Sequence, residues 1–337
     1  RLNYTTGVAN PYLLLEPSRT NIITNSEYLG GSDWIKSGNG TGSVPVITSN
    51  AAISPEGVQN ATRVDLDLNG GTSSGDWSWV YQNFTSTGND ETFSMYVKAV
   101  DASNVGKVIA FGAVSFTAQS LTADWVRIES TSSAAVGGYG NGFRLRGTEG
   151  TSNTASFYVF GIQHEQNASY PTSYIPTYSV SATRAQDVCN KTDASGEIGQ
   201  TEGTLFVDLS NVQNLDFPEI TIDNNSNTDR IVLTRDATGN WGIFVASSVT
   251  TPSSNVVYSA VGGTSGKFAI AYSSIGYVLY RNGVQISTLT YGLPSALSVF
   301  RLNGRSTNDY NSIKNINQAQ LYTTRLTNAE LATLTTI

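Results

Sequence analysis

The sequence feature that most constrains the fold is a two-residue hydrophobic period that recurs along almost the whole chain. Segments with this alternation are bounded by Gly, Asn, Ser or Asp and return about every 8 to 12 residues, a spacing typical of sandwiches and jelly rolls. In residues 91–100, ETFSMYVKAV, one face carries Phe93, Met95 and Val97, and the residues between them form a more polar face. The pattern predicts an all-β protein whose strands have one core face and one wet face.

The length of the chain indicates more than one such core. At 337 residues it is too long for one ordinary domain and suits two of roughly 150 residues each. Strand-like segments fill residues 78–165, and a second set fills residues 204–324. Between them, AQDVCNKTDASGEIGQTEG at 185–203 is polar and has no strand pattern. We therefore expect two tandem β-sandwich (jelly-roll) domains.

Two local signals in the second half have a specific structural meaning. GYVLYRNGVQIST at 276–288 contains two alternating runs about Asn282-Gly283. This predicts a β-hairpin, because both turn positions need positive φ. The last residues, RLTNAELATLTTI, predict a short helix capped by Thr327 or Asn328.

Composition excludes several functional classes. Charged residues make up only 13% of the chain, the net charge is −7, and the cations are isolated rather than clustered. Nucleic acid is therefore not an expected partner, because binding it needs clustered cations. No run of 18 apolar residues is present, so no membrane span is predicted. Cys189, the single cysteine, cannot form a disulfide within the chain, and since the sequence starts at Arg1 we expect an upstream anchor.

Long phrases at both ends of the first half resemble a module of tailed-bacteriophage structural proteins. RLNYTTG followed by LLLEPSRTN looks like the opening LLLEPxRTN phrase, and FGIQHEQNASYPTSYIPT followed by ATRAQDVC looks like its close. NIITNSEYLGGSDWIKSG and AAISPEGVQNATRVDLD are similar to the first strands of family 4/9-type carbohydrate-binding jelly rolls. The chain departs from the family pattern at His164, where an apolar residue is more usual, and at Asn167.

The second half resembles a concanavalin A-like (laminin-G-like) sandwich in TEGTLFVDL, LYRNGVQI and LYTTRLTNAELATL. Together the resemblances imply four parts: a docking segment at 1–20, a carbohydrate-binding-module-like jelly roll at 21–188, a linker at 189–203 and a concanavalin A-like sandwich at 204–337. They also imply a location on the exterior of a virion, on the capsid or tail.

The best candidate for a glycan site is the segment DWSWVYQ. Trp77, Trp79 and Tyr81 lie two apart and so project from one face of a strand. Flat aromatic faces stack on sugar rings, and polar neighbours fix the hydroxyls. Arg144 and Arg146, also two apart, can supply donors if their strand shares that face. The alternative is that the aromatic row is half of a sandwich core, since strands are enriched in aromatics for packing reasons alone.

A structural calcium ion is implied only by the resemblance. Jelly-roll carbohydrate modules often hold one ion through oxygen ligands from the first and closing strands, and Asn25 and Glu27 occupy the corresponding stretch. The alternative is a hydrogen-bonded turn. No other cofactor is expected.

No catalytic residue is predicted. His164 has no second His and no Cys nearby in sequence, and general-base work needs an orienting partner. A glycosidase needs only two opposed carboxylates, but no spacing singles out a pair, Asp65 and Asp67 included.

Three functional hypotheses follow. The first is a non-enzymatic bacteriophage fibre, decoration or tail-adhesion protein that binds host-surface or environmental glycans. Such a protein would contact other virion proteins and form a homo-oligomer, with a trimer favoured. The second is a purely structural virion protein, which predicts burial of Trp77, Trp79 and Tyr81. The third is a polysaccharide depolymerase, which predicts two convergent carboxylates in a cleft.

Overall fold

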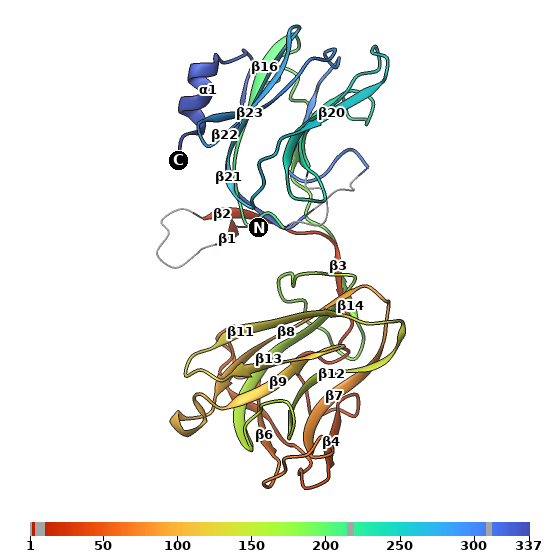
Figure 1. Ribbon diagram of the computed structural model, residues 1–337, viewed down its shortest axis with the longest axis vertical. Coiled ribbons are helices and arrows are strands. Elements are labelled where there is room, and N and C mark those ends of the chain that lie inside the picture. The colour runs from red at the N-terminus through yellow and green to blue at the C-terminus, as the bar shows by residue number, and fades with distance from the viewer. Residues whose placement is uncertain (1, 4–10, 214–218, 308–311) are drawn as a thin grey trace. The chain divides into compact units, whose positions relative to one another are not determined.

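The computed structural model describes residues 2–3, 11–213, 219–307 and 312–337. The protein is nearly all β, as predicted, and divides into two compact units (Figure 1). The first lobe comprises residues 19–184, and the second lobe comprises residues 1–18 together with 185–337. The part of the chain that the structure describes contains no helix long and apolar enough to cross a membrane.

The first lobe is a two-layer sandwich of antiparallel strands. Its larger sheet has the order β11 (Val126–Ser133), β8 (Asp90–Ala99), β13 (Thr154–Gln166), β3 (Arg19–Asn21) and β14 (Ala182–Arg184), with β6 (Ala61–Asp67) and β5 (Val46–Ala52) continuing from β13. The smaller sheet has the order β10 (Phe116–Ser120), β9 (Val108–Gly112), β12 (Gly137–Arg146), β7 (Trp77–Ser86) and β4 (Ile35–Asn39). A single 3₁₀ turn, Ala102–Asn104, follows β8.

Apolar side chains from both sheets form the core of the first lobe. Phe93, Met95 and Val97 of β8 are fully buried, which confirms the core face predicted for them. The prediction that the other face is wet is wrong at Thr92 and Ser94, which are buried as well. Phe111 of β9 and Phe143 of β12 meet them from the smaller sheet. Burial of such side chains contributes about 1.5 to 3 kcal/mol each and is what holds the layers together.

The second lobe is also a two-layer sandwich. One sheet has the order β1 (Leu2–Asn3), β2 (Tyr12–Leu15), β25 (Lys314–Tyr322), β16 (Glu202–Ser210), β21 (Gly266–Ser273), β22 (Gly276–Arg281) and β23 (Val284–Leu289). The other has the order β15 (Asn190–Lys191), β24 (Val299–Arg301), β17 (Ile220–Asp223), β18 (Arg230–Arg235), β19 (Trp241–Ala246) and β20 (Ser254–Tyr258).

A helix covers the outer side of the first of these sheets. Helix α1 (Asn328–Thr335) lies beside β22 (Figure 1). Its Leu331 is buried in one cluster with Phe206 of β16 and Tyr280 of β22. The side chain of Thr327 accepts a hydrogen bond from Glu330 N–H, and the carboxylate of Glu330 accepts one from Thr327 N–H, forming a capping box. The cap predicted for the terminal helix is therefore confirmed.

The predicted hairpin at Asn282-Gly283 is also confirmed. Both residues have positive φ, 50° and 81°, and they join β22 to β23. Asn and Gly tolerate this conformation better than other residues, so these two residues determine the position of the turn.

The structure corrects the predicted domain boundaries at both ends of the jelly roll. Leu13 of β2 pairs with Ile316 of β25, and Leu15 belongs to the core of the second lobe. Residues 12–15 of the predicted docking segment 1–20 thus form a strand of the second lobe, and residues 19–20 belong to β3 of the first lobe. Residues 1 and 4–10 of that segment lie outside the described residues. The predicted linker 189–203 holds β15 and the fully buried Ala194 and Ile198, so it belongs to the same lobe.

Candidate functional site

The aromatic row of β7 lies on the outer side of its sheet. Ser78, Val80 and Gln82 are buried and face the sandwich interior. Trp77, Trp79 and Tyr81 alternate with them and are partly exposed, so they face away from the core. The alternative interpretation of this row as half of the core is therefore wrong.

Trp79 and Tyr81 form a stacked pair. Their ring centroids are 3.8 Å apart with an interplanar angle of 21°. Phe116 of β10 meets Trp79 edge-on at 5.8 Å. Both stacked rings lean over Gly140 of β12, where an added Cβ would lie 2.8 Å from Trp79 and 3.0 Å from Tyr81. The glycine therefore leaves the space that the rings occupy.

Arg144 holds these rings in place. It is the cross-strand partner of Trp79, so the two side chains project to the same side of the sheet. Its guanidinium lies 3.8 Å from the ring centroid of Phe116 and 5.0 Å from that of Trp79. The Nε of Arg144 donates to Glu149 at 2.8 Å, and the side chain is only 12% exposed. Arg144 is thus largely engaged within the protein.

Arg146 is the more accessible of the two arginines. It pairs across the strands with Trp77, and its side chain is 32% exposed. Its Nε donates to the carbonyl of Ser74 at 2.8 Å, while its Nη1 is 3.4 Å from Glu149. The indole N–H of Trp77 donates to the hydroxyl of Ser37 on β4 at 3.2 Å.

These side chains form one continuous surface, here called the aromatic face. It consists of Trp77, Trp79, Tyr81, Phe116, Arg144, Arg146 and Glu149. Partly exposed rings beside guanidinium donors can stack on the C–H faces of a sugar and hydrogen-bond its hydroxyls. All five residues predicted for the glycan site are brought together here.

Sequence reasoning missed two members of the aromatic face and one glycine that supports it. Phe116 lies on an edge strand that pairs with β9 rather than with β7. Glu149 lies in the turn after β12, three residues from Arg146 and five from Arg144. That spacing was a usable signal for Glu149, whereas Gly140 gave none because its role depends on where the rings lean.

His164 belongs to a polar cluster inside the first lobe. Its side chain is fully buried, its Nε2 lies 3.0 Å from a carboxylate oxygen of Glu91, and its Nδ1 lies 2.8 Å from the amide nitrogen of Asn141. These partners fit a neutral ring that donates to Glu91 and accepts from Asn141. Burial lowers the pKa of His164, and the hydrogen bond and charge of Glu91 offset this only in part.

The carboxylates of Glu165 and of Asp65 and Asp67, the pair named above, make hydrogen bonds that fit structural roles. Glu165 is fully buried and accepts from the backbone N–H of Thr172 at 2.8 Å. Asp65 accepts from Arg63 Nε at 3.0 Å, and Asp67 accepts from Asn69 N–H at 2.7 Å. Asp65 and Asp67 therefore bind different partners rather than a shared substrate position.

The residues expected to hold calcium do not form a typical calcium cage. The carboxylate of Glu27 accepts hydrogen bonds from Tyr174 at 3.0 Å and Asn60 at 3.2 Å. The side-chain oxygen of Asn25 accepts from Ser179 N–H at 3.0 Å. Among the residues described, no group of three or more His, Cys, Asp or Glu side chains is placed to hold a metal ion. Calcium usually takes 6 to 8 oxygen ligands, some of them from backbone carbonyls and water, so a structural ion at Asn25 and Glu27 stays a prediction.

Comparison with known proteins found similarity among solved structures. The sequence matches no protein-family model, and it matches no curated protein. The CBM40 module of the Ruminococcus gnavus IT-sialidase, bound to α2,3-sialyllactose, is 18% identical over 41% of this chain and 84% of that one, with a TM-score of 0.35.

Two enzymes named in this comparison are also similar. A Trypanosoma rangeli sialidase in complex with the inhibitor DANA is 13% identical over 40% of this chain and 22% of that one, with a TM-score of 0.32. A carbohydrate esterase of the Shiga toxin-encoding bacteriophage phi24B is 10% identical over 93% of this chain and 99% of that one, with a TM-score of 0.21. Scores at this level do not assign a function to the chain.

Proposed function

We propose that the first lobe binds a glycan on its aromatic face and that the protein is a non-enzymatic component of a bacteriophage virion. The observation that carries the binding proposal is the outward direction of the β7 row. Trp77 and Tyr81 present ring surface to the sugar, and Arg146 supplies donors to its hydroxyls. Trp79 and Arg144 act mainly by holding the rings, since each is packed against Phe116.

The virion context is inferred from the sequence phrases LLLEPSRTN and FGIQHEQNASYPTSYIPT. A fibre, decoration or tail protein on the exterior of the particle is present in many copies. Weak binding at each aromatic face then becomes effective through multivalency. We propose that the subunits associate into a trimer and contact other virion proteins.

Two other functions are less well supported. A purely structural sandwich predicts a buried aromatic row, and partial exposure of all three rings favours glycan binding instead. A depolymerase needs two convergent carboxylates. The aromatic face has one, Glu149, which is paired with Arg144.

A pair of glycine substitutions on β12 tests the proposal. Gly140→Ala places a methyl group against the outer ends of Trp79 and Tyr81 and forces the rings to move. Gly138→Ala, on the same strand, meets no heavy atom within 4 Å and is the matched control. On a glycan array, wild type and Gly138→Ala should bind the same sugars. Gly140→Ala should bind these sugars with an affinity lower by a factor of about ten or more.

Trp77→Ala and Trp79→Ala complete the experiment. Both should weaken binding, and their melting temperatures should stay near that of wild type because these side chains lie outside the core. Absence of binding by the intact protein to any glycan, or equal binding by Gly140→Ala and Gly138→Ala, would refute a role for the aromatic face.

A further inference from the structure

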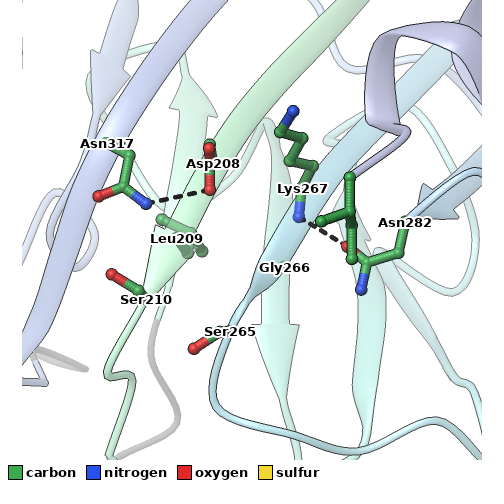
Figure 2. A pocket seen from close by; sticks show the side chains of 9 residues that line it. Asp208, Leu209, Ser210, Ser265, Gly266, Lys267, Asn282 and Asn317 are labelled. Carbon is green, nitrogen blue, oxygen red and sulfur yellow. Dashed lines mark hydrogen bonds between the residues drawn. The ribbon is translucent and has the colours of Figure 1, made fainter.

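The second lobe contains a hollow that has no connection with the aromatic face. It has a volume of about 270 Å³ and opens on the outer side of the sheet formed by β25, β16 and β21 (Figure 2). Its lining combines the apolar residues Leu209, Gly266 and Ile337, which can contact C–H groups of a ligand, with six polar residues: Asp208, Ser210, Ser265, Lys267, Asn282 and Asn317. Pockets for drug-sized ligands begin at about 300 Å³, so this one is the size of a single sugar ring rather than of an oligosaccharide.

Irregular backbone places the polar groups of this pocket. The ladder between β16 and β25 shifts register next to Asp208, and Asn317 lies in the resulting bulge. Bulges of this kind re-aim side chains, and here Asn317 Nδ2 donates to Asp208 Oδ1 at 3.1 Å (Figure 2). Asn282 has positive φ, and its side-chain oxygen accepts from Lys267 N–H at 3.0 Å. Two separate departures from regular strand geometry thus converge on one hollow.

The charges of the pocket favour a neutral ligand. Asp208 and Lys267 are cross-strand partners, so the negative and positive side chains lie on the same side of the sheet. The ammonium group of Lys267 donates to the carbonyl of Thr336 at 2.9 Å, after the end of α1. The charge of Lys267 stays beside that of Asp208, so these two side chains give the pocket no net charge, and the carboxylate and amides supply hydrogen-bonding groups.

The hydrogen-bonding capacity of the lining matches a polyhydroxyl compound. A carboxylate accepts from adjacent hydroxyls, while side-chain amides both donate and accept. Asp208 and Asn317 form one hydrogen bond with each other. The side-chain oxygen of Asn282 accepts from a backbone N–H, so the side-chain amide hydrogens of Asn282 can donate to a ligand. We propose that this pocket binds a single neutral sugar unit, with Asp208 and Asn317 as the residues that recognise its hydroxyls.

Saturation-transfer NMR with neutral monosaccharides tests this proposal on the full chain. Glucose, galactose, mannose and N-acetylglucosamine serve as probes. Every protein carries Trp77→Ala and Tyr81→Ala, which remove the two rings proposed to contact a sugar on the aromatic face. Asp208→Asn and Asn317→Ala should each weaken binding of the best sugar about tenfold. Gln318→Ala, an exposed neighbour on β25 that does not line the pocket, should bind like its parent.

Several results would overturn the proposal. They are no transfer to any of the four sugars, equal transfer in Asp208→Asn, Asn317→Ala and Gln318→Ala, and preferential binding of methylammonium. The last result would identify a site for a cation. Loss of glycan-array binding in Gly140→Ala, together with sugar transfer that survives the combined Trp77→Ala and Tyr81→Ala substitutions, would show that the two sites are independent.

Discussion

Acidification from neutral pH should destabilise the first lobe through one group, His164. It is the only histidine of the chain, and it is fully buried against Glu91 and Asn141. Glu165 adds a second negative charge nearby, and the rings of Phe84 and Phe93 complete its surroundings. Desolvation dominates these effects and keeps the pKa of His164 below its usual 6.5.

The direction of the pH effect follows from this lowered pKa. Below pH 6.5 the unfolded chain takes up a proton that the folded chain does not. The free energy of unfolding therefore falls as pH drops, by up to about 1.4 kcal/mol per pH unit for one proton. The contribution is complete above pH 6.5 and is lost as pH falls toward the lowered pKa of the folded state.

Glu91, the partner of His164, titrates in a lower range. Burial raises the pKa of Glu91, but hydrogen bonds from His164 and from Thr87 N–H outweigh it, so the pKa lies below its usual 4.5. Glu91 therefore adds a loss of stability only as pH falls below that value. The window between about pH 6.5 and 5 belongs to His164.

Urea unfolding at several pH values measures this slope. Tryptophan fluorescence reports mainly on the first lobe, which holds Trp34, Trp77, Trp79 and Trp125, four of the five tryptophans. His164→Gln keeps a donor for Glu91 but cannot titrate, so its stability should be flat across the window. Equal slopes in both proteins, or an NMR titration of the folded histidine with a midpoint at 6.5 or above, would refute the reasoning.

Three further substitutions have expected outcomes. Asp223→Ala leaves the buried guanidinium of Arg301 without the carboxylate that lies 2.6 Å from its Nε, and should cost about 3 to 5 kcal/mol in urea unfolding of the second lobe; a cost below that of an average surface change would contradict it. Thr327→Ala removes the cap of α1 and should cost about 1 kcal/mol, with Thr327→Ser restoring most of it in thermal melts. Gly161→Ala forces a side chain into the left-handed region at φ 62° in the bulge of β13 and should cost about 1 to 2 kcal/mol by calorimetry, whereas Gly150→Asn, at φ 67° in an open turn, should cost less.

The local features of this protein were predictable because neighbouring residues determine them. Alternation over residues 91–100 identified the strand and its core face, since side chains on a strand change sides at every residue. Asn282-Gly283 identified a turn because few other residues tolerate its φ angles, and Thr327 with Glu330 identified a helix start. Each of these signals lies within a few residues of the structure that it specifies.

The boundaries of the two lobes were not predictable in this way. Leu13 pairs with Ile316, which lies about 300 positions away in the sequence. The residues around Leu13 and around Ile316 give no indication that the two strands pair. Ala194 and Ile198 lie in a polar stretch that looks like a linker, yet the core of the second lobe encloses both. Such contacts depend on which strand edges and core surfaces the rest of the chain leaves open.

The aromatic row of β7 separates what the sequence predicts from what the tertiary structure decides. The sequence of residues 77–82 determined that Trp77, Trp79 and Tyr81 share one side of a strand, because successive side chains of a strand point to opposite sides. They did not determine which side, since burial of a face is decided by the sheet that packs against it. The larger sheet covers Ser78, Val80 and Gln82, and a glycine at 140 makes room for the rings on the other side.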